Sequence, residues 1–579
     1  MSQPTESAPS PVVPKKYLAA FIMVTLLFPL WGFANDITNP MVSAFKKILL
    51  ISNFESSLVQ AAFYGGYCFM AIPAALFIKR FSYKSGILVG LALYSAAALF
   101  FPVAGQMMSF NLFLLAYFIM TCGLSFLETT ANPYVLSMGA QDTATRRLNL
   151  AQAFNPMGSL TGMFVAMTFI LANLASVSHD SEIAPVLAEK AYEKIETIAK
   201  TNSDDAAKWK QIGESGVQSW VTTSDEVTKA LEAKTAVDWD NVLTSLQADH
   251  KRLAKVLTVI NHTDSTDAEK WTSIQQQHLL GKLDDKGKQK IETSIVKGKE
   301  VNWENTALLD GSPDEEKARK LISEVDESKW KSIQQGDLNV LQGPYFAIGI
   351  VVALFFVIFL FTKLPTSHSE DDKSLHLGST LSRLFSNSNY VGGVVAQAFY
   401  VGAQIMCWTF IIQYAGNELD MRATTAQGYN IAAMIIFVSS RFICTFLLKY
   451  VSPGSLLAVL AVGGGTLVAG AIFIQGMTGL YCLIGVSACM SLMFPTIYGI
   501  ALDGLGDDAK LGAAGLIVAI GGGCLMPPLQ AAIMDKDAFE LGFMTLSSTR
   551  VSFVLPLICF VVIAIYGYLA HKKHHGEVA

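Results

Sequence analysis

The stretch ETTANPYVLSMGAQDTATRR, residues 128–147, has a faint counterpart far along the chain in MFPTIYGIALDGLGDDAK, residues 493–510. In both, an apolar run passes through a proline into a short loop that holds an acid and a base. The first contains Pro133, Asp142 and Arg146, and the second contains Pro495, Asp507 and Lys510. Similarity at corresponding places indicates two related halves, arranged as an internal parallel repeat.

The composition places both halves in a membrane. The 579 residues are 52% hydrophobic and 15% charged, whereas soluble domains have about 25% charged residues. A membrane-spanning helix needs roughly 20 mostly apolar residues. Twelve candidate spans lie at about 17–44, 57–79, 85–105, 110–137, 148–175, 344–363, 389–414, 427–449, 455–475, 478–502, 511–533 and 549–571. We therefore expect an all-α membrane protein with the major facilitator fold, in which twelve transmembrane helices form two six-helix bundles.

The distribution of Lys and Arg orients the chain, because cytoplasmic loops are enriched in both. With a cytoplasmic N-terminus, fourteen of these residues fall in the inside segments and five in the short outside loops. Both termini are therefore expected in the cytoplasm. The first apolar run is too long for a signal peptide, so we expect an uncleaved first span.

A long polar interval, residues 176–342, follows the fifth span and is therefore expected on the side away from the cytoplasm. It holds 52 of the chain's 89 Asp, Glu, Lys and Arg residues. It also repeats, because DAAKWKQI (205–212), DAEKWTSI (267–274) and DESKWKSI (326–333) recur about every sixty residues, and VDWDNVLTSL (237–246) resembles VNWENTALLD (301–310). Sparse Gly and Pro favour tandem helical units. These units are either a sugar- or protein-docking module or a duplicated spacer whose tryptophans form small cores.

The predicted organisation follows the chain. A disordered cytoplasmic tail (1–16) precedes the first five helices (17–175), the repeated helical insert (176–342), helix six (343–363), a cytoplasmic linker (364–387), the C-terminal bundle (388–571) and a second cytoplasmic tail (572–579). The eight cysteines lie in apolar runs without metal-ligand spacing, so we expect small core residues, with no metal site and no disulfide framework.

Two acids interrupt the predicted spans. Of the seventeen acidic residues outside the insert, all but Asp36 and Glu128 fall in predicted loops or tails. A carboxylate inside a membrane costs a few kcal/mol, so each is a candidate functional group; the alternative is a protonated or paired carboxyl that serves packing alone. Arg441 is the clear intramembrane base. We expect it to anchor a helix end or to act as a gate rather than to bind substrate.

Amides accompany these acids at helical spacing. Asn35, Asp36 and Asn39 share adjoining faces of the first span, with Trp31 one turn earlier. The fifth span adds Asn149, Gln152 and Asn155, and the seventh adds Gln397, Tyr400, Gln404, Trp408 and Gln413. A single amide of this kind is more often helix–helix glue. Amides, carboxylates and an aromatic ring together suit an uncharged polyhydroxylated ligand, because hydroxyls pair with the polar groups while the ring covers C–H faces.

Seven stretches carry a resemblance to a known family: FPLWGFAND, NFESSLVQAAFYGGY, KRFSYKSGILVGLALY, GLSFLETTANPYV, RRLNLAQAFNPMGS, AQAFYVGAQIMCW and MFPTIYGIALDGLG. They cover both halves, and the sequence resembles the fucose:proton symporters of the major facilitator superfamily. LETTANP followed by LNLAQAFN is the specific part. The resemblance implies a bacterial inner-membrane transporter that imports a hexose or deoxyhexose, with L-fucose first and galactose or glucose next.

The resemblance also implies roles for individual residues. Glu128 matches the family's essential glutamate, which is linked to proton exchange and sugar contact. Asn35 and Asp36 match a polar pair, and Gln152 and Asn155 match residues of the sugar cavity. In the family a proton-accepting aspartate stands at the position of Asn39, whereas this chain has an amide there and its acid three residues earlier at Asp36. Either Asp36 has taken over the proton role, or Glu128 carries coupling alone. The long insert is a second departure.

The resulting expectation is a proton-coupled sugar importer that works by alternating access. Glu128 and Asp36 couple protons, and Trp31, Asn35, Asp36, Asn39, Glu128, Gln152, Asn155, Gln404 and Trp408 bind the sugar. It needs no cofactor beyond the proton, contacts lipid but no nucleic acid, acts as a monomer and is not an enzyme. Two alternatives remain: a proton-driven efflux antiporter, whose cavity should be apolar, and a non-transporting nutrient receptor that uses the insert.

Overall fold

The structure is a computed structural model that describes residues 12–576 apart from short gaps. Outside the description are residues 1–11, 140–146, 148–149, 178–182, 216, 219–220, 222, 263, 282, 284, 299–300, 302, 304–307, 309–314, 366–376, 420, 422, 448–449, 506–507, 538, 541–544 and 577–579. The loop residues Asp142, Arg146 and Asp507 of the internal repeat, and Asn149 of the fifth span, therefore lie outside it.

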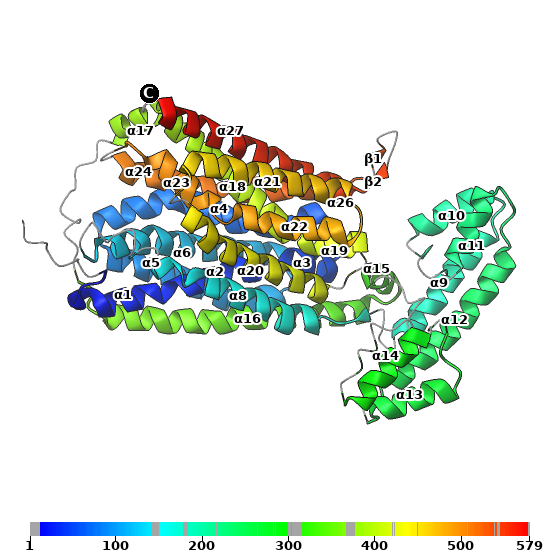
Figure 1. Cartoon of the computed structure of the whole chain (residues 1–579). Coiled ribbons are helices and arrows are strands. Elements are labelled where there is room, and N and C mark those ends of the chain that lie inside the picture. Colours follow the sequence, from blue (N-terminus) through cyan, green and yellow to red (C-terminus); the bar gives the residue numbers. More distant parts are fainter. Residues whose placement is uncertain are drawn as a thin grey trace, which may run out of the picture. The chain divides into compact units, whose positions relative to one another are not determined.

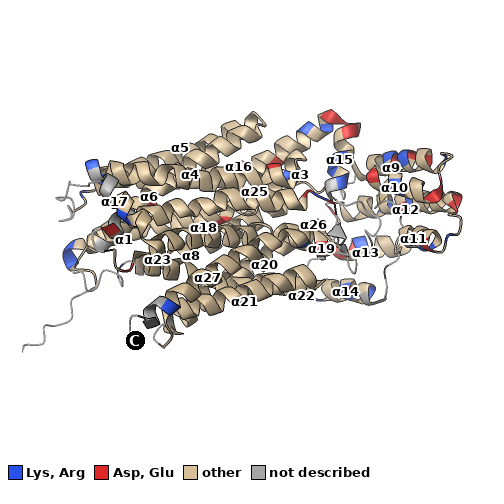
Figure 2. Cartoon of the chain, turned by 90° about the horizontal axis from the view of Figure 1, so that it is seen from above, with Lys and Arg blue, Asp and Glu red and all other residues tan. Residues whose placement is uncertain are grey.

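The chain forms two compact units. One consists of Met1–Leu174 and Asp337–Ala579, and the other of Ala175–Gly336 (Figure 1). Lys, Arg, Asp and Glu are spread over the helices of the second unit, whereas in the first most of them lie at the two ends of the helices (Figure 2). Charge is therefore distributed as expected for a membrane-embedded bundle and a solvated insert.

The first half of the membrane unit is all-helical. Its elements are α1 (Leu18–Thr25), α2 (Leu27–Thr38), α3 (Met41–Leu49), α4 (Asn53–Arg80), α5 (Tyr83–Gln106), α6 (Phe110–Ser137), α8 (Asn155–Val165), a π-helix (Ala166–Ile170), a 3₁₀ turn (Leu171–Asn173) and α16 (Glu327–Phe361). Asn39 and Pro40 separate α2 from α3, so the first span breaks directly after its polar patch.

The second half repeats this arrangement. Its elements are α17 (Leu377–Ser386), α18 (Ser388–Thr409), α19 (Ile411–Leu419), α20 (Ala423–Leu447), α21 (Pro453–Phe473), α22 (Met477–Met490), α23 (Met493–Leu502), α24 (Ala509–Val518), η11 (Ala519–Gly521), α25 (Gly522–Met534), α26 (Ser548–Ser552) and α27 (Val554–Gly576). The short strands β1 (Phe539–Glu540) and β2 (Thr545–Leu546) pair antiparallel between α25 and α26.

Eleven helices among the described residues are long and apolar enough to cross a membrane. They match every predicted span except the eighth, whose place is filled by the 25-residue helix α20. The prediction of an all-helical membrane fold is confirmed. The sixth span differs in its start, because α16 begins at Glu327 rather than near residue 344 and runs for 35 residues. Hydropathy marks where lipid contact begins, and the polar residues before it continue the same helix.

The insert contains seven helices before α16 within its described residues: α9 (Ile183–Ala199), α10 (Asp205–Glu214), α11 (Ser224–Glu232), α12 (Trp239–Ile260), α13 (Asp267–Gln276), α14 (Asp285–Val296) and α15 (Glu315–Val325). The sequence repeat is also a repeat of contacts. Asp205 accepts hydrogen bonds from the Val237 backbone N–H at 2.9 Å and the Trp239 indole at 2.7 Å. Asp267 accepts the same pair from Val301 and Trp303, each at 2.7 Å.

Candidate functional site

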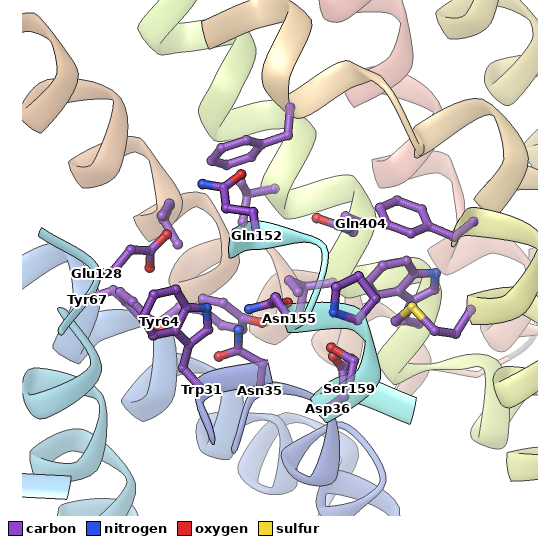
Figure 3. Close-up of a pocket in the computed structure, with 18 of the residues that line it drawn as sticks. Trp31, Asn35, Asp36, Tyr64, Tyr67, Glu128, Gln152, Asn155, Ser159 and Gln404 are labelled. Atoms are coloured by element: carbon purple, nitrogen blue, oxygen red, sulfur yellow. The ribbon is translucent and has the colours of Figure 1, made fainter. Parts of the chain in front are cut away.

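A cavity of about 220 Å³ lies between the two halves of the membrane unit (Figure 3). Its lining comes from α2, α4, α6 and the segment around α8 in the first half, and from α18, α20, α23 and η11 in the second. Helices α5, α16, α21 and α27 contribute no described lining residue. The corresponding helices of each half therefore share one role, as the internal repeat predicts.

Glycines bring the polar faces of α2 and α8 together. A methyl group added at Gly162 would lie 2.6 Å from the Phe33 carbonyl oxygen. Methyl groups at Gly158 and Gly32 would collide with the carbonyl oxygens of Pro29 and Asn155. Close backbone approach of this kind is the usual reason for small residues between membrane helices.

Asp36 is held by donors from two helices. It is 5% exposed, and its Oδ1 accepts a hydrogen bond from Asn39 Nδ2 at 3.0 Å. The Ser159 hydroxyl on α8 lies beside the same carboxyl (Figure 3). Donors around a carboxylate stabilise its charged form.

Glu128 has a different environment. It lines the cavity from α6, with Tyr64 and Tyr67 of α4 nearby (Figure 3). Among the described residues we find no hydrogen bond to its carboxyl group. Proton uptake at Glu128 therefore breaks no hydrogen bond to a described residue.

Unsatisfied polar atoms and aromatic rings complete the cavity. Asn35 Oδ1 and the Tyr67 hydroxyl are buried and lie near one another, but neither has a hydrogen-bond partner of good geometry among the described residues. Buried polar groups are normally paired, so both are suited to ligand hydroxyls. Trp31 from the first half and Trp408 from the second supply apolar faces, with the Trp408 indole held by Ser487 at 3.1 Å.

Eight of the nine residues predicted to bind substrate line this cavity: Trp31, Asn35, Asp36, Glu128, Gln152, Asn155, Gln404 and Trp408. The ninth, Asn39, is not part of the lining. It is 2% exposed, and its Oδ1 accepts hydrogen bonds from Gln60 Nε2 at 3.1 Å and from the Thr409 hydroxyl at 3.4 Å. Gln397 and Gln413 of the seventh span are also buried away from the lining.

Sequence reasoning missed several lining residues. Tyr64 and Tyr67 lie one turn apart in an apolar run, next to a glycine pair, and Ser159 follows Asn155 by one turn. The spacing of Ser159 from Asn155, a residue already predicted to bind substrate, could have identified Ser159, whereas the span of Tyr64 and Tyr67 held no predicted site residue. Arg441 also lines the cavity, although we expected it to act as an anchor or gate. Its Nε donates to the Ser491 carbonyl oxygen at 3.2 Å, and its guanidinium lies 4.9 Å from the centre of the Phe437 ring.

The two halves are joined at one end of the bundle. Asp535, at the end of α25, accepts hydrogen bonds from the backbone N–H groups of Asn53 (2.9 Å) and Phe54 (2.7 Å) and from Asn53 Nδ2 (2.6 Å). Deeper in the bundle, Gln60 of α4 donates to the Thr409 hydroxyl of α18 at 3.1 Å. These contacts join the halves at the end where α3 meets α4.

Comparison with known proteins places the chain among transporters. It is 41% identical to the L-fucose-proton symporter of Haemophilus influenzae over 561 residues, covering 97% of this chain and 98% of that protein. The chain belongs to the fucose:proton symporter family of the major facilitator superfamily. The recognition made from the sequence motifs is thus confirmed. No protein-family model matches the chain.

Two further proteins are similar to this chain over nearly its whole length. The chain is 24% identical over 566 residues to the glucose/galactose transporter of Brucella abortus, covering 96% of each. A crystal structure of the major facilitator transporter FucP in the outward conformation matches with a TM-score of 0.56 and 25% identity, covering 96% of this chain and 99% of that one. The predicted major facilitator fold is therefore confirmed, and the relatives are transporters rather than enzymes.

Proposed function

We propose that this chain is a proton-coupled sugar symporter that imports a hexose or deoxyhexose by alternating access, with L-fucose as the first candidate and galactose or glucose next. The observation that carries the proposal is the cavity between the halves. It combines two carboxyl groups with the amides of Asn35, Gln152, Asn155 and Gln404 and with a tryptophan from each half. The names of the fucose and glucose/galactose relatives support the substrate class.

The cycle follows from the burial of the acids. A bare carboxylate is costly in a closed, dry cavity, so a proton must bind before or together with the swing of the two halves. Sugar hydroxyls then pair with the amides, and the halves rock to expose the site on the other side. Loss of the proton inside releases the sugar. A membrane potential of 100 mV contributes about 2.3 kcal/mol per proton, or roughly fiftyfold accumulation.

The membrane placement belongs to the same proposal. We place the chain in a bacterial inner membrane as a monomer surrounded by lipid, with both termini in the cytoplasm and the insert in the periplasm. The excess of Lys and Arg in the inside segments supports this orientation. Relatives from Haemophilus and Brucella support a bacterial membrane.

Two alternatives fit the structure less well. An efflux antiporter for amphiphilic compounds needs a larger and more apolar site, since pockets for drug-sized ligands are about 300–1,000 Å³; this cavity is about 220 Å³ and rich in amides. A receptor that binds sugar through the insert needs accessible aromatic rings. Trp271, Trp303 and Trp330 are instead 5–7% exposed, and Trp209 and Trp239 are half-buried.

The experiment is counterflow and proton-driven uptake in vesicles with a panel of labelled hexoses and deoxyhexoses. We expect one of them to enter and to alkalinise the medium as it does so. The Glu128→Gln variant should lose proton-driven accumulation, because the carboxyl that takes up the proton is gone. Alkalinisation that survives intact in this variant would contradict the role of Glu128. A wild-type chain that moves no sugar would contradict the function itself.

A further inference from the structure

We propose that two buried amides, Gln60 of α4 and Asn430 of α20, are positioning residues that bring Trp408 against the sugar when the bundle closes at the end where α3 meets α4. The inference rests on the proposed symport, whose orientation makes this the outer end. Neither amide lines the cavity, whereas Trp408 does. Both amides are 0% exposed, and each is the eighth residue of the second membrane helix in its half. The internal repeat therefore places them at corresponding positions.

Each amide holds a break in the first membrane helix of its half. In the first half the break follows α2 at Asn39, whose Oδ1 accepts a hydrogen bond from Gln60 Nε2 at 3.1 Å. In the second half Phe410 separates α18 from α19, and the Trp408 carbonyl oxygen before this break accepts from Asn430 Nδ2 at 3.2 Å. The last carbonyl groups of a helix have no partner within it, so an amide side chain is a suitable donor to them. Repeat-related amides therefore fix repeat-related breaks.

The first half of the bundle also holds the break of the second half, by two routes. Gln60 Nε2 donates to the Thr409 hydroxyl at 3.1 Å. Asn430 Nδ2 donates to Gln427 Oε1 at 3.3 Å, and Gln427 Nε2 in turn donates to the Met163 carbonyl oxygen of α8 at 3.5 Å. Because α4 and α8 belong to one half and α18 and α20 to the other, the contacts of Thr409 and Gln427 with the first half exist only while the halves are together here.

These contacts determine where the ring of Trp408 lies. Its indole N–H donates to Ser487 Oγ at 3.1 Å, and its ring meets that of Phe437 edge-on, with 5.0 Å between the ring centres. A ring held at its edge pivots with the backbone that carries it, and that backbone is the segment tied to the first half. Parting of the halves at the outer end releases this segment, and closure brings the ring back. An aromatic ring against the C–H faces of a sugar contributes to binding, so closure tightens the site.

The first test is the affinity of the purified full chain for L-fucose, D-galactose and D-glucose, measured by calorimetry. Asn430→Leu should raise the Kd of the sugar that binds about five- to tenfold, because it removes buried hydrogen bonds to the backbone of Trp408. Trp408→Ala removes the ring itself. In the Trp408→Ala background, Asn430→Leu should therefore change the Kd by less than about twofold. Equal losses of affinity in both backgrounds would overturn the proposal, because a purely structural role of Asn430 does not depend on the ring.

The second test needs no sugar and follows the closure of the outer end. Its readout is the distance distribution between spin labels at Leu49 and Lys536, measured by electron–electron double resonance. Thr409→Val keeps the shape of the side chain but removes the acceptor of Gln60, so the ratio of closed to open molecules should fall about five- to tenfold. Thr496→Val is the matched control, since Thr496 is equally buried in the second half and its hydroxyl donates to the carbonyl oxygen four residues earlier.

The outcomes separate this inference from the proposed symport. Where Thr409→Val fails to insert into the membrane, Gln60→Met removes the same contact from the other half. Wild-type distance distributions in these variants would overturn the proposal, as would equal shifts in Thr409→Val and the Thr496→Val control. A wild type that binds none of the three sugars would instead contradict the proposed symport, and the closure measurement would still decide whether Gln60 and Thr409 hold the outer end.

Discussion

Replacing Asp535 by Asn should shift the transporter toward a state that is open at the end where α3 meets α4. Asp535 lies at the end of α25 in the second half, and its carboxylate accepts the N–H groups of Asn53 and Phe54. These two residues begin α4 in the first half, and the first N–H groups of a helix have no partner within that helix. A negative charge there is also favoured by the helix dipole.

The size of the effect follows from these contacts. Hydrogen bonds to a charged group contribute about 1.5–3 kcal/mol, and neutral ones about 0.5–1.5 kcal/mol. Asn at position 535 keeps one acceptor oxygen but has no charge. Asp535 is exposed, and water therefore reduces the free-energy difference between the charged and the neutral hydrogen bonds. The closed state should therefore lose about 1–2 kcal/mol relative to the open state, which moves the population ratio about five- to thirtyfold. The remaining contact between Gln60 and Thr409 is unaffected.

The assay is the distance distribution between spin labels at Leu49 and Lys536, measured by electron–electron double resonance. Asp535→Asn should enlarge the long-distance fraction, and high salt should weaken the effect of the variant because the site is exposed. Asp537→Asn is the matched control, since it makes the same charge change two residues further on. Equal distributions in Asp535→Asn and wild type would refute the reasoning. Equal shifts in both variants would show an effect of net charge rather than of the contact.

Three predictions concern the insert. Deleting residues 178–336 and joining the ends with a flexible linker should leave uptake intact. Every lining residue of the cavity is outside the deleted segment, and a change in loop length costs little free energy. Loss of uptake despite normal membrane insertion would show that the insert takes part in transport. The N–H groups of Val237 and Trp239 lower the pKa of Asp205 from its usual 3.8, so its contribution to stability is present above that value and is lost as the pH falls through the lower one. Asp205→Asn should therefore speed hydrogen exchange in α10 and the start of α12 at pH 7, with α13 as the internal control. Burial lowers the pKa of His250 to about 4 from 6.5, so the insert should lose stability as the pH falls from about 6.5 toward 4. Hydrogen exchange of the insert should therefore speed up over this pH range, and His250→Gln should remove that increase. An unchanged pH dependence of exchange in the variant would contradict the role of His250.

Much of the site could be predicted from the sequence. Helical spacing shows which residues share one face of a helix, and residue type shows which of those faces is polar. Asn35, Asp36 and Trp31 share adjoining faces of the first span, and all three line the cavity. The repeat in the insert could also be predicted, since an Asp at the start of one helix and a Val-x-Trp segment recur together, with the Trp 34 residues after the Asp in one copy and 36 in the other. Similar separation of two repeated features within one chain favours a contact between them.

The rest depends on partners that are distant in the sequence. Asn39 lies on a face that spacing alone assigns to the cavity, yet its neighbours Gln60 and Thr409 come from 21 and 370 residues away. The position of the Arg441 side chain could not be predicted for a related reason, because hydropathy gives the depth of a residue in a span but not the direction of a long side chain. The start of α16 was missed because a helix can continue beyond the apolar residues that reveal it.

The arrangement of Asp36 and Asn39 explains how this chain can differ from the pattern that the resemblance implies and still keep a buried hydrogen-bond network. Asn39 donates to Asp36 through Nδ2 and accepts from Gln60 through Oδ1, so its amide uses both of its functions. A carboxylate at position 39 has no proton to donate and would face the Asp36 carboxylate at hydrogen-bond distance, where two like charges repel. An acid at position 36 therefore requires a donor at position 39. In this packing the acid at position 36 and the amide at position 39 are therefore a single coupled departure from the pattern that the resemblance implies.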